Sequence, residues 1–265
     1  MLLSSAGLLL IAYPLTVGGE RRWPAWSFVM LAAGVVALTV FVAQQRAKTA
    51  KDGSALVALS LFQSKAFTGG LAAHLVFGLV SGVLLLTWVL FMQSGLGLSP
   101  GQFAPASVAI SIGGMGGAML ASRWAGRHMR RVPQAGAVLI ALTLAGYQLL
   151  VSAQQTGVPF VAAVAPMILV GAGFGMVGAG LAGLTLSQVG HEGAGSAAGL
   201  FNTALQLGTA LGIAAASVVF FDHAPAGSDG TTVTSAFAGS IWYVSAALVV
   251  MWALMFRLPK PTRSN

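Results

Sequence analysis

Four polar side chains lie in segments that are otherwise apolar, and their positions suit hydrogen bonding inside a membrane. Asn202 and Gln206 are four residues apart, so on a helix they share one face. His74 stands early in another apolar segment and Gln93 stands at its end. Polar groups within a bilayer are costly and often functional. We expect these four side chains to line a substrate cavity, with Asn202 and Gln206 as the first candidates.

A second interpretation is open for the same residues. Polar side chains in a membrane also hold neighbouring helices together by hydrogen bonds. For Asn202 and Gln206 the cavity and the helix-joining roles are equally supported. For His74 the structural role is favoured, although imidazole ordinarily titrates near neutral pH, which keeps a proton-carrying role open.

Other kinds of chemistry find little support. The chain has no cysteine and its histidines, His74, His128, His191 and His223, lack metal-ligand spacing, so no metal site is predicted. A serine hydrolase would need an acid near a histidine and a serine, and no acid lies within an apolar segment. The stretch Gly173–Gly178 fits G-x-G-x-x-G, but it lies inside an apolar run rather than after a strand. We therefore predict neither an enzyme nor a cofactor.

The elements that position these residues are long apolar segments. Of 265 residues, 57% are apolar and 18 are charged, and none of the charged residues falls inside a long apolar run. A helix crosses the apolar part of a bilayer in about 20 residues. The sequence therefore predicts an all-α membrane protein with eight transmembrane helices. Their expected ranges are 2–17, 25–43, 68–92, 103–121, 134–152, 158–187, 197–221 and 236–256.

The basic residues indicate how the chain crosses the membrane. Eight spans place both termini on one side, and eleven of the thirteen basic residues fall on that side. The positive-inside rule makes it cytoplasmic. The net charge of +8 is thereby explained without nucleic acid. We expect a plasma (inner) membrane protein with cytoplasmic termini, in contact with membrane lipid.

The spans are unevenly spaced, which predicts four parts. Residues 1–45 form a two-helix hairpin, 46–67 a basic cytoplasmic linker, 68–257 a six-helix bundle and 258–265 a cytoplasmic tail. Within the linker, residues 55–62 form either a short amphipathic helix on the membrane surface or a partly ordered connection.

Glycine and arginine each mark one further feature. Small residues let helices approach closely in lipid, and bending is the other use of glycine. We predict a packing role for six glycines, which are Gly171, Gly173, Gly175, Gly178, Gly208 and Gly212.

The loop 122–131 carries Arg123, Arg127, Arg130 and Arg131. These arginines either anchor the topology and contact anionic lipid or latch a cytoplasmic gate.

Four stretches resemble one family. The loop 122–131 resembles the repeat of the basic cytoplasmic motif of the major facilitator superfamily. In that superfamily's fourteen-helix drug:proton antiporters, similar sequences occur just before and at the end of the ninth helix and around the thirteenth. The corresponding segments here are 59–67, 88–99 and 193–212, of which the last is the most specific. The two-plus-six layout resembles what remains of such an antiporter without its first six helices.

The resemblance implies the C-terminal part of a multidrug efflux antiporter. Its substrate would be a small hydrophobic or amphipathic molecule, bound between this part and an N-terminal six-helix half. A proton gradient would supply the energy, through an acid in that N-terminal half. One departure is that Gly126 precedes Arg127, where the family's motif has Asp, which weakens the case for an ion-paired latch.

Other functions are compatible with the sequence. The chain could pair with a separate N-terminal half as a split transporter. It could instead be a membrane scaffold or regulatory subunit that does not transport, or a truncated reading frame without a function of its own.

Overall fold

The computed structural model describes residues 2–17, 24–51, 59–128, 130–153, 160–187, 189–190, 193–225 and 227–256. These residues are almost wholly helical. The α-helices are α1 (Leu2–Val17), α2 (Ala25–Lys51), α3 (Lys65–Leu90), α4 (Pro100–His128), α5 (Arg131–Ala153), α6 (Phe160–Leu186), α7 (Ala194–His223) and α8 (Gly230–Phe256). The expected all-α fold is confirmed.

Six of the described helices, α3 to α8, are long and apolar enough to cross a membrane. Helix α1 has 16 residues, and the apolar part of α2 is the short stretch Ala25–Ala37. Spanning by α1 and α2 therefore stays a prediction. Helix α2 also continues to Lys51, beyond the expected boundary at residue 45, while residues 52–58 of the expected linker lie outside the described part.

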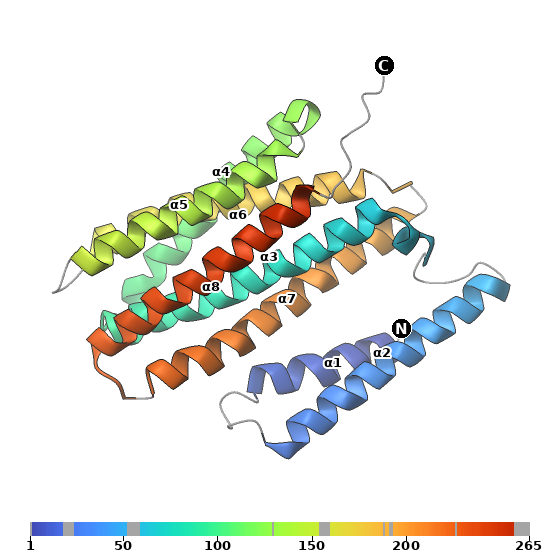
Figure 1. The fold of residues 1–265 in the computed structure, drawn as a ribbon, viewed down its shortest axis with the longest axis horizontal. Helices are drawn as coiled ribbons and strands as arrows, with labels where there is room; N and C mark the ends of the chain where they lie inside the picture. The colour runs from blue at the N-terminus through green and yellow to red at the C-terminus, as the bar shows by residue number, and fades with distance from the viewer. Residues whose placement is uncertain are drawn as a thin grey trace.

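Helices α3 to α8 pack side by side, and the α1–α2 hairpin lies next to α7 (Figure 1). The most extensive contacts join α3 with α7 and α4 with α6. Ser64 begins α3 as a helix cap, because its Oγ accepts the Phe67 backbone N–H at 3.3 Å. The element α3 is central, since it also contacts α6 and α8.

Glycine brings α3 and α7 into backbone contact. A Cβ atom on Gly78 or Gly82 would overlap the carbonyl oxygen of a residue in α7. A Cβ atom on Gly208 or Gly212 would overlap a carbonyl oxygen of α3 in return. Each helix thus contributes a G-x-x-x-G pair, the spacing that lets membrane helices approach most closely. We call these four residues the α3–α7 glycine crossing.

Helices α4 and α6 meet in the same way. Gly113 and Gly117 lie against backbone atoms of α6, and Gly171 and Gly175 lie against backbone atoms of α4. The two other glycines expected to pack have different neighbours. Gly173 approaches Ile140 and the Gly136 carbonyl of α5. Gly178 faces the Phe77 ring, and a Cβ atom on it would make an ordinary contact of 3.5 Å with that ring.

The C-terminal end of α3 changes its helical pitch. Residues Phe91–Gly95 form one wider π-helical turn, in which the Leu96 N–H donates to the Phe91 carbonyl at 2.9 Å. The helical structure therefore runs past Gln93, the expected end of the span. Gly97 then adopts a φ of 68°, a left-handed conformation that suits glycine, and the chain turns into α4.

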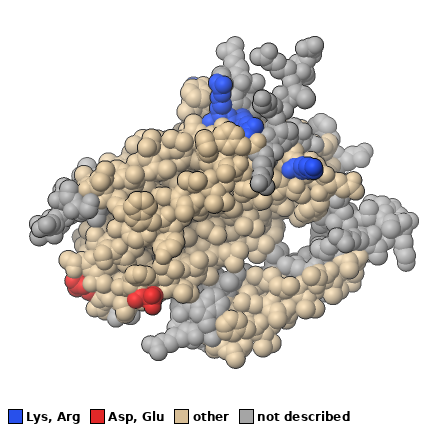
Figure 2. All heavy atoms as spheres, viewed as in Figure 1, with Lys and Arg blue, Asp and Glu red and all other residues tan. Residues whose placement is uncertain are grey.

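The charged side chains of the described residues divide between the two ends of the bundle. Figure 2 shows Lys and Arg gathered at one end and Asp at the other. Lys65 and Arg131 begin α3 and α5, whereas Asp222 and Asp229 flank the α7–α8 connection. We call these the basic end and the acidic end.

Candidate functional site

His74 lies inside the bundle near the basic end. Its ring is buried and stacks on Phe201 of α7, with ring centroids 3.6 Å apart and planes 20° from parallel. The ring also approaches Phe77, at 5.7 Å between centroids. Its Nδ1 is buried and has no hydrogen-bond partner among the described residues. The imidazole thus serves as an aromatic contact between α3 and α7 in this conformation.

Asn202 and Gln206 lie on the exposed face of α7, one turn apart. Neither side chain has a hydrogen bond to another described residue, so they do not join α7 to a neighbour in this structure. The adjoining exposed positions are Gly195, Ala198 and Gly199, all small. We call these five residues the amide face of α7.

The amide face differs from the exposed face of α8. There the exposed side chains are large and apolar, including Trp242, Val249 and Val250. Such residues suit contact with lipid, where unpaired carboxamides are unfavourable. The amide face is therefore a poor surface for lipid and a suitable wall for a hydrated cavity.

The structure does not bring all four polar candidates together. His74 stacks on Phe201, the residue before Asn202, but the His74 ring is buried whereas Asn202 is exposed. Gln93 lies 19 positions after His74 along α3, about 28 Å at 1.5 Å per residue. It is exposed on the π-helical turn, near the opposite end of the bundle.

The described arginines of the loop 122–131 lie in different environments. Arg123 and Arg131 are exposed, and the side chain of Arg127 lies outside the described part. Arg130 is half-buried, and its guanidinium carbon lies 5.0 Å from the centre of the Phe256 ring at the end of α8. Cation–π contact of this kind joins the loop to α8. Arg123, Arg130 and Arg131 form no ion pair with a described residue, and the gate-latch role of the loop stays a prediction.

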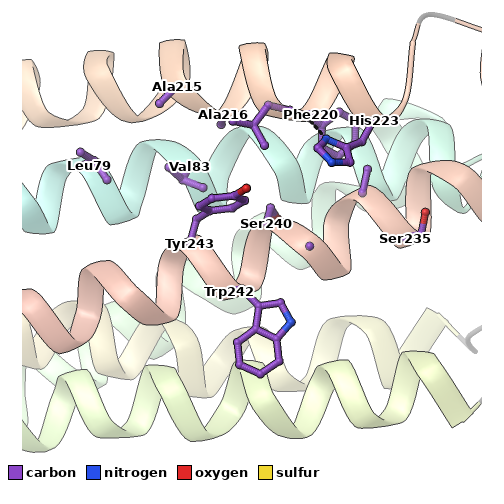
Figure 3. Close-up of a pocket in the computed structure, with 13 residues that line it drawn as sticks. Leu79, Val83, Ala215, Ala216, Phe220, His223, Ser235, Ser240, Trp242 and Tyr243 are labelled. Atoms are coloured by element: carbon purple, nitrogen blue, oxygen red, sulfur yellow. Dashed lines mark hydrogen bonds between the residues drawn. The ribbon is translucent and has the colours of Figure 1, made fainter.

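A pocket near the acidic end was not expected from the sequence. It has a volume of about 670 Å³, lies between α3, α7 and α8, and is open on one side, where the lining residues Trp242 and Tyr243 are exposed (Figure 3). Leu79 and Val83 of α3 form one wall, Phe220 and His223 of α7 another, and Ser240 and Tyr243 of α8 the third. None of the four predicted polar residues lines it.

The signals for this pocket in the sequence were weak. Serine, as at positions 235 and 240, is common in membrane helices. His223 lies two positions beyond the expected span 197–221, but in the structure it ends α7. The space arises because Ala215, Ala216 and Gly239 carry small side chains where three helices meet. Such a pocket depends on helix spacing, which periodicity does not report.

Comparison with known proteins places the chain among transporters. The sequence profile of the Major Facilitator Superfamily matches residues 1–213. The "Probable actinorhodin transporter" of Streptomyces coelicolor is 35% identical over 227 residues, covering 83% of this chain and 38% of that protein. The "Cephamycin export protein CmcT" of Amycolatopsis lactamdurans is 33% identical over 221 residues, covering 80% and 43%.

A more distant relative covers more of the chain. The "Putative multidrug resistance protein MdtD" of Escherichia coli is 27% identical over 259 residues, covering 95% of this chain and 50% of that protein. The chain thus spans half, or less than half, of the length of these relatives. The helical structure, the six long apolar helices and the profile match over most of the sequence agree. The chain belongs to the Major Facilitator Superfamily.

Proposed function

We propose that this chain is the C-terminal part of a proton-coupled efflux antiporter for small hydrophobic or amphipathic molecules. The amide face of α7 carries the proposal, because Asn202 and Gln206 are exposed there among small residues and have no hydrogen-bond partner in the described part of the chain. A second six-helix half placed opposite this face would complete a cavity with carboxamides on one wall. The names of the relatives, which refer to export and drug resistance, support the same function.

In this proposal the basic end faces the cytoplasm of a cell whose plasma membrane holds the protein. The described Lys and Arg side chains gather at that end, which the positive-inside rule assigns to the cytoplasm. The proton gradient would supply the energy. His74 stacks on Phe201, the residue before Asn202, and its stacked and buried ring supports a structural rather than a proton-carrying role.

Export by a completed transporter tests the proposal. The chain would be joined to the N-terminal six helices of the Streptomyces coelicolor relative and expressed in bacteria that lack their own drug pumps. We expect energy-dependent export of a fluorescent drug. The double substitution Asn202→Leu and Gln206→Leu should reduce export at least tenfold while leaving the amount of folded protein unchanged, because it removes hydrogen bonds to substrate.

A matched control uses an exposed polar residue elsewhere. Thr39 is exposed on α2, and its hydroxyl donates only within that helix, to the Val36 carbonyl at 2.8 Å. Thr39→Leu should leave export unchanged. Full export by the Asn202/Gln206 double variant would refute the cavity role. A folded chimaera that exports nothing would favour a scaffold over a transporter.

A further inference from the structure

Where α5 begins, buried nitrogen atoms of two side chains carry hydrogens and have no acceptor among the described residues. They are Nε and Nη2 of Arg130 and Nε2 of Gln134. Gln134 lies in the first turn of α5, four positions after Arg130. A buried donor without an acceptor costs free energy, and the cost is larger when the donor is charged. An anion that accepts from both side chains would offset this cost.

The guanidinium group of Arg130 presents a matched pair of donors. Its Nε and Nη2 atoms lie on one edge of the group, and their N–H groups form a fork that fits two oxygens of a carboxylate or a phosphate. The flat side of the group lies over the Phe256 ring at the end of α8. Arg130 is only half-buried, and Phe256 is 52% exposed, so a change in the Arg130 side-chain angles turns the fork toward the surface.

The charges at this end of the bundle favour an anion. The first turn of α5 contains no acidic residue, and the start of a helix carries partial positive charge. Arg123 and Arg131 add two exposed positive charges at the same end. Among the described residues, the acids are Asp222 and Asp229, which lie at the acidic end. Nothing in the described part therefore competes with an external anion for these donors.

The number of donors favours a phosphate over a carboxylate. The Arg130 fork occupies two oxygens, which are all that a carboxylate has. The Gln134 amide then needs a further oxygen, and a phosphate has one to offer. The first backbone N–H groups of a helix, which lack acceptors within it, provide additional donors to such a group.

The surroundings place the cluster at the level of lipid headgroups. Trp252 and Phe256 of α8 are both exposed and pack edge to face, with ring centroids 4.4 Å apart. Exposed aromatic side chains near the ends of membrane helices typically lie at the border between lipid tails and headgroups. From there, α5 exposes Val138, Leu142 and Leu149 along the bundle, which suits contact with acyl chains. The phosphate of a membrane phospholipid would thus lie beside Arg130.

We propose that Arg130 and Gln134 bind a phosphate group where α5 begins and α8 ends. The fork of Arg130 holds two phosphate oxygens, and the Gln134 amide donates to a third. A phospholipid in the membrane supplies the phosphate, and soluble phosphate is the other source that the test distinguishes. Binding here requires no transport, so failure of the chimaera to export would leave this site untouched.

Lipid binding to the purified full chain in detergent tests the site, with native mass spectrometry as the measurement. The probe is dioleoylphosphatidylglycerol, and its counterpart is dioleoylglycerol, which has the same acyl chains without phosphate. We expect the phospholipid to bind more tightly by about tenfold or more, as charge-assisted hydrogen bonds allow.

Arg130→Lys keeps the positive charge but removes the fork. It should weaken binding of the phospholipid about tenfold. Arg123→Lys is the matched control, because Arg123 is exposed at the same end and has no ion pair with a described residue. It should bind the phospholipid as the unmodified chain does. If Arg130→Lys does not fold, Phe256→Leu removes the cation–π contact and should weaken binding about threefold, while Phe256→Tyr should not.

Gln134→Leu tests the second donor. It should weaken binding of the phospholipid about fivefold, as expected for the loss of one hydrogen bond. Without added lipid the Tm should not fall, because the Gln134 amide nitrogen has no acceptor to lose among the described residues. Gln63→Leu is the control, since Gln63 is an exposed glutamine at the same end, just before α3. It should leave lipid binding unchanged.

Three results would overturn the proposal. Equal binding of dioleoylglycerol would show that the phosphate is not recognised. Phospholipid binding that is unchanged in both Arg130→Lys and Gln134→Leu would place the lipid elsewhere. Tighter phospholipid binding in Asp52→Asn or Glu192→Gln, whose positions lie outside the described part, would identify a carboxylate of the chain itself as the partner of Arg130.

Inorganic phosphate distinguishes the two sources of the group. An excess of inorganic phosphate should not displace the phospholipid, because the acyl chains add binding energy that the free ion lacks. Displacement by inorganic phosphate, together with phosphate binding to the lipid-free chain that is lost in Arg130→Lys, would overturn the lipid assignment and make the site one for soluble phosphate.

Discussion

The α3–α7 helix pair carries an exposed polar face toward one end and a mostly apolar pocket toward the other. Toward the basic end, α7 exposes Asn202 and Gln206 on an open face. Toward the acidic end, α3, α7 and α8 line a partly open pocket whose lining is mostly apolar. The α3–α7 glycine crossing lies between them. The more polar side chains thus lie on the open face of α7, and the pocket lining is the more apolar of the two surfaces.

This difference teaches which features depend on the chain alone. The pocket follows from packing within the six helices, so it should exist in the isolated chain. A cavity at the amide face needs a second structural half. Substitutions that change packing should therefore alter the isolated chain, whereas those on the amide face should alter only the completed transporter.

The largest effect is expected at the glycine crossing that both ends share. A Cβ atom at Gly208 would overlap the Leu75 carbonyl oxygen, so Gly208→Leu must push α3 and α7 apart. Overpacking of a core typically costs about 1–3 kcal/mol, and backbone contacts leave little room to adjust. We expect a loss of about 3 kcal/mol or more, seen as little monodisperse protein and a lowered Tm in detergent.

Gly199→Leu provides the contrast on the same helix. Gly199 lies on the amide face, where a Cβ atom meets nothing within 4 Å. The isolated chain should keep its Tm, while the chimaera should lose export because the added side chain enters the cavity. Equal stability of the Gly208 and Gly199 variants would contradict the close approach of α3 and α7.

The second effect tests what His74 contributes at the basic end. His74→Ala removes a buried ring stacked on Phe201 and should destabilise the chain by about 3 kcal/mol, as for other aromatic deletions. His74→Phe keeps the stack and removes an unpartnered Nδ1, so it should remain within about 1 kcal/mol of the original chain. Unfolding in increasing denaturing detergent measures both. Equal losses would show that imidazole itself is needed.

The sequence alone was sufficient to predict the helices, but not how closely the helices approach one another. Long apolar runs predicted the helical fold, and the positions of Asn202 and Gln206 predicted a shared face, because both depend on local periodicity. The pocket depends on Ala215, Ala216 and Gly239 meeting across helices, which no local pattern reports. The π-helical turn that carries Gln93 was missed for a similar reason, since one extra residue per turn leaves the apolar composition unchanged.

A smaller effect is expected in the aromatic cluster near the acidic end. Tyr147 packs against Trp88, Phe91 and Phe237, and its hydroxyl is buried without a partner among the described residues. Tyr147→Phe removes that unpaired hydroxyl and keeps the ring. We expect unchanged stability or a gain of up to about 1 kcal/mol. A clear loss in Tm would reveal a polar partner. Tyr243→Phe, at an exposed position, is the control and should leave the Tm unchanged.

The smallest effect concerns the start of α8, which forms one side of the pocket. The Asp229 carboxylate accepts hydrogen bonds from the hydroxyls of Thr231 and Thr232 and from the Thr232 N–H. These bonds, that of Thr231 foremost, hold the pKa of Asp229 below its ordinary value. Because the folded-state pKa is the lower one, the carboxylate stabilises the fold at neutral pH, and this contribution declines as the pH falls below the ordinary pKa of Asp, about 4.

Asp229→Asn should therefore lower the Tm slightly at pH 7, and the difference should shrink as the pH approaches about 3, where the original carboxyl is increasingly protonated. Asp229→Ala also removes the acceptor oxygens at the helix start, so its deficit should persist at both pH values. A Tm difference for Asp229→Asn that grows on acidification would contradict the assigned hydrogen bonds. The start of α8 would then be held by other contacts, and the acidic end of the pocket would be positioned by packing alone.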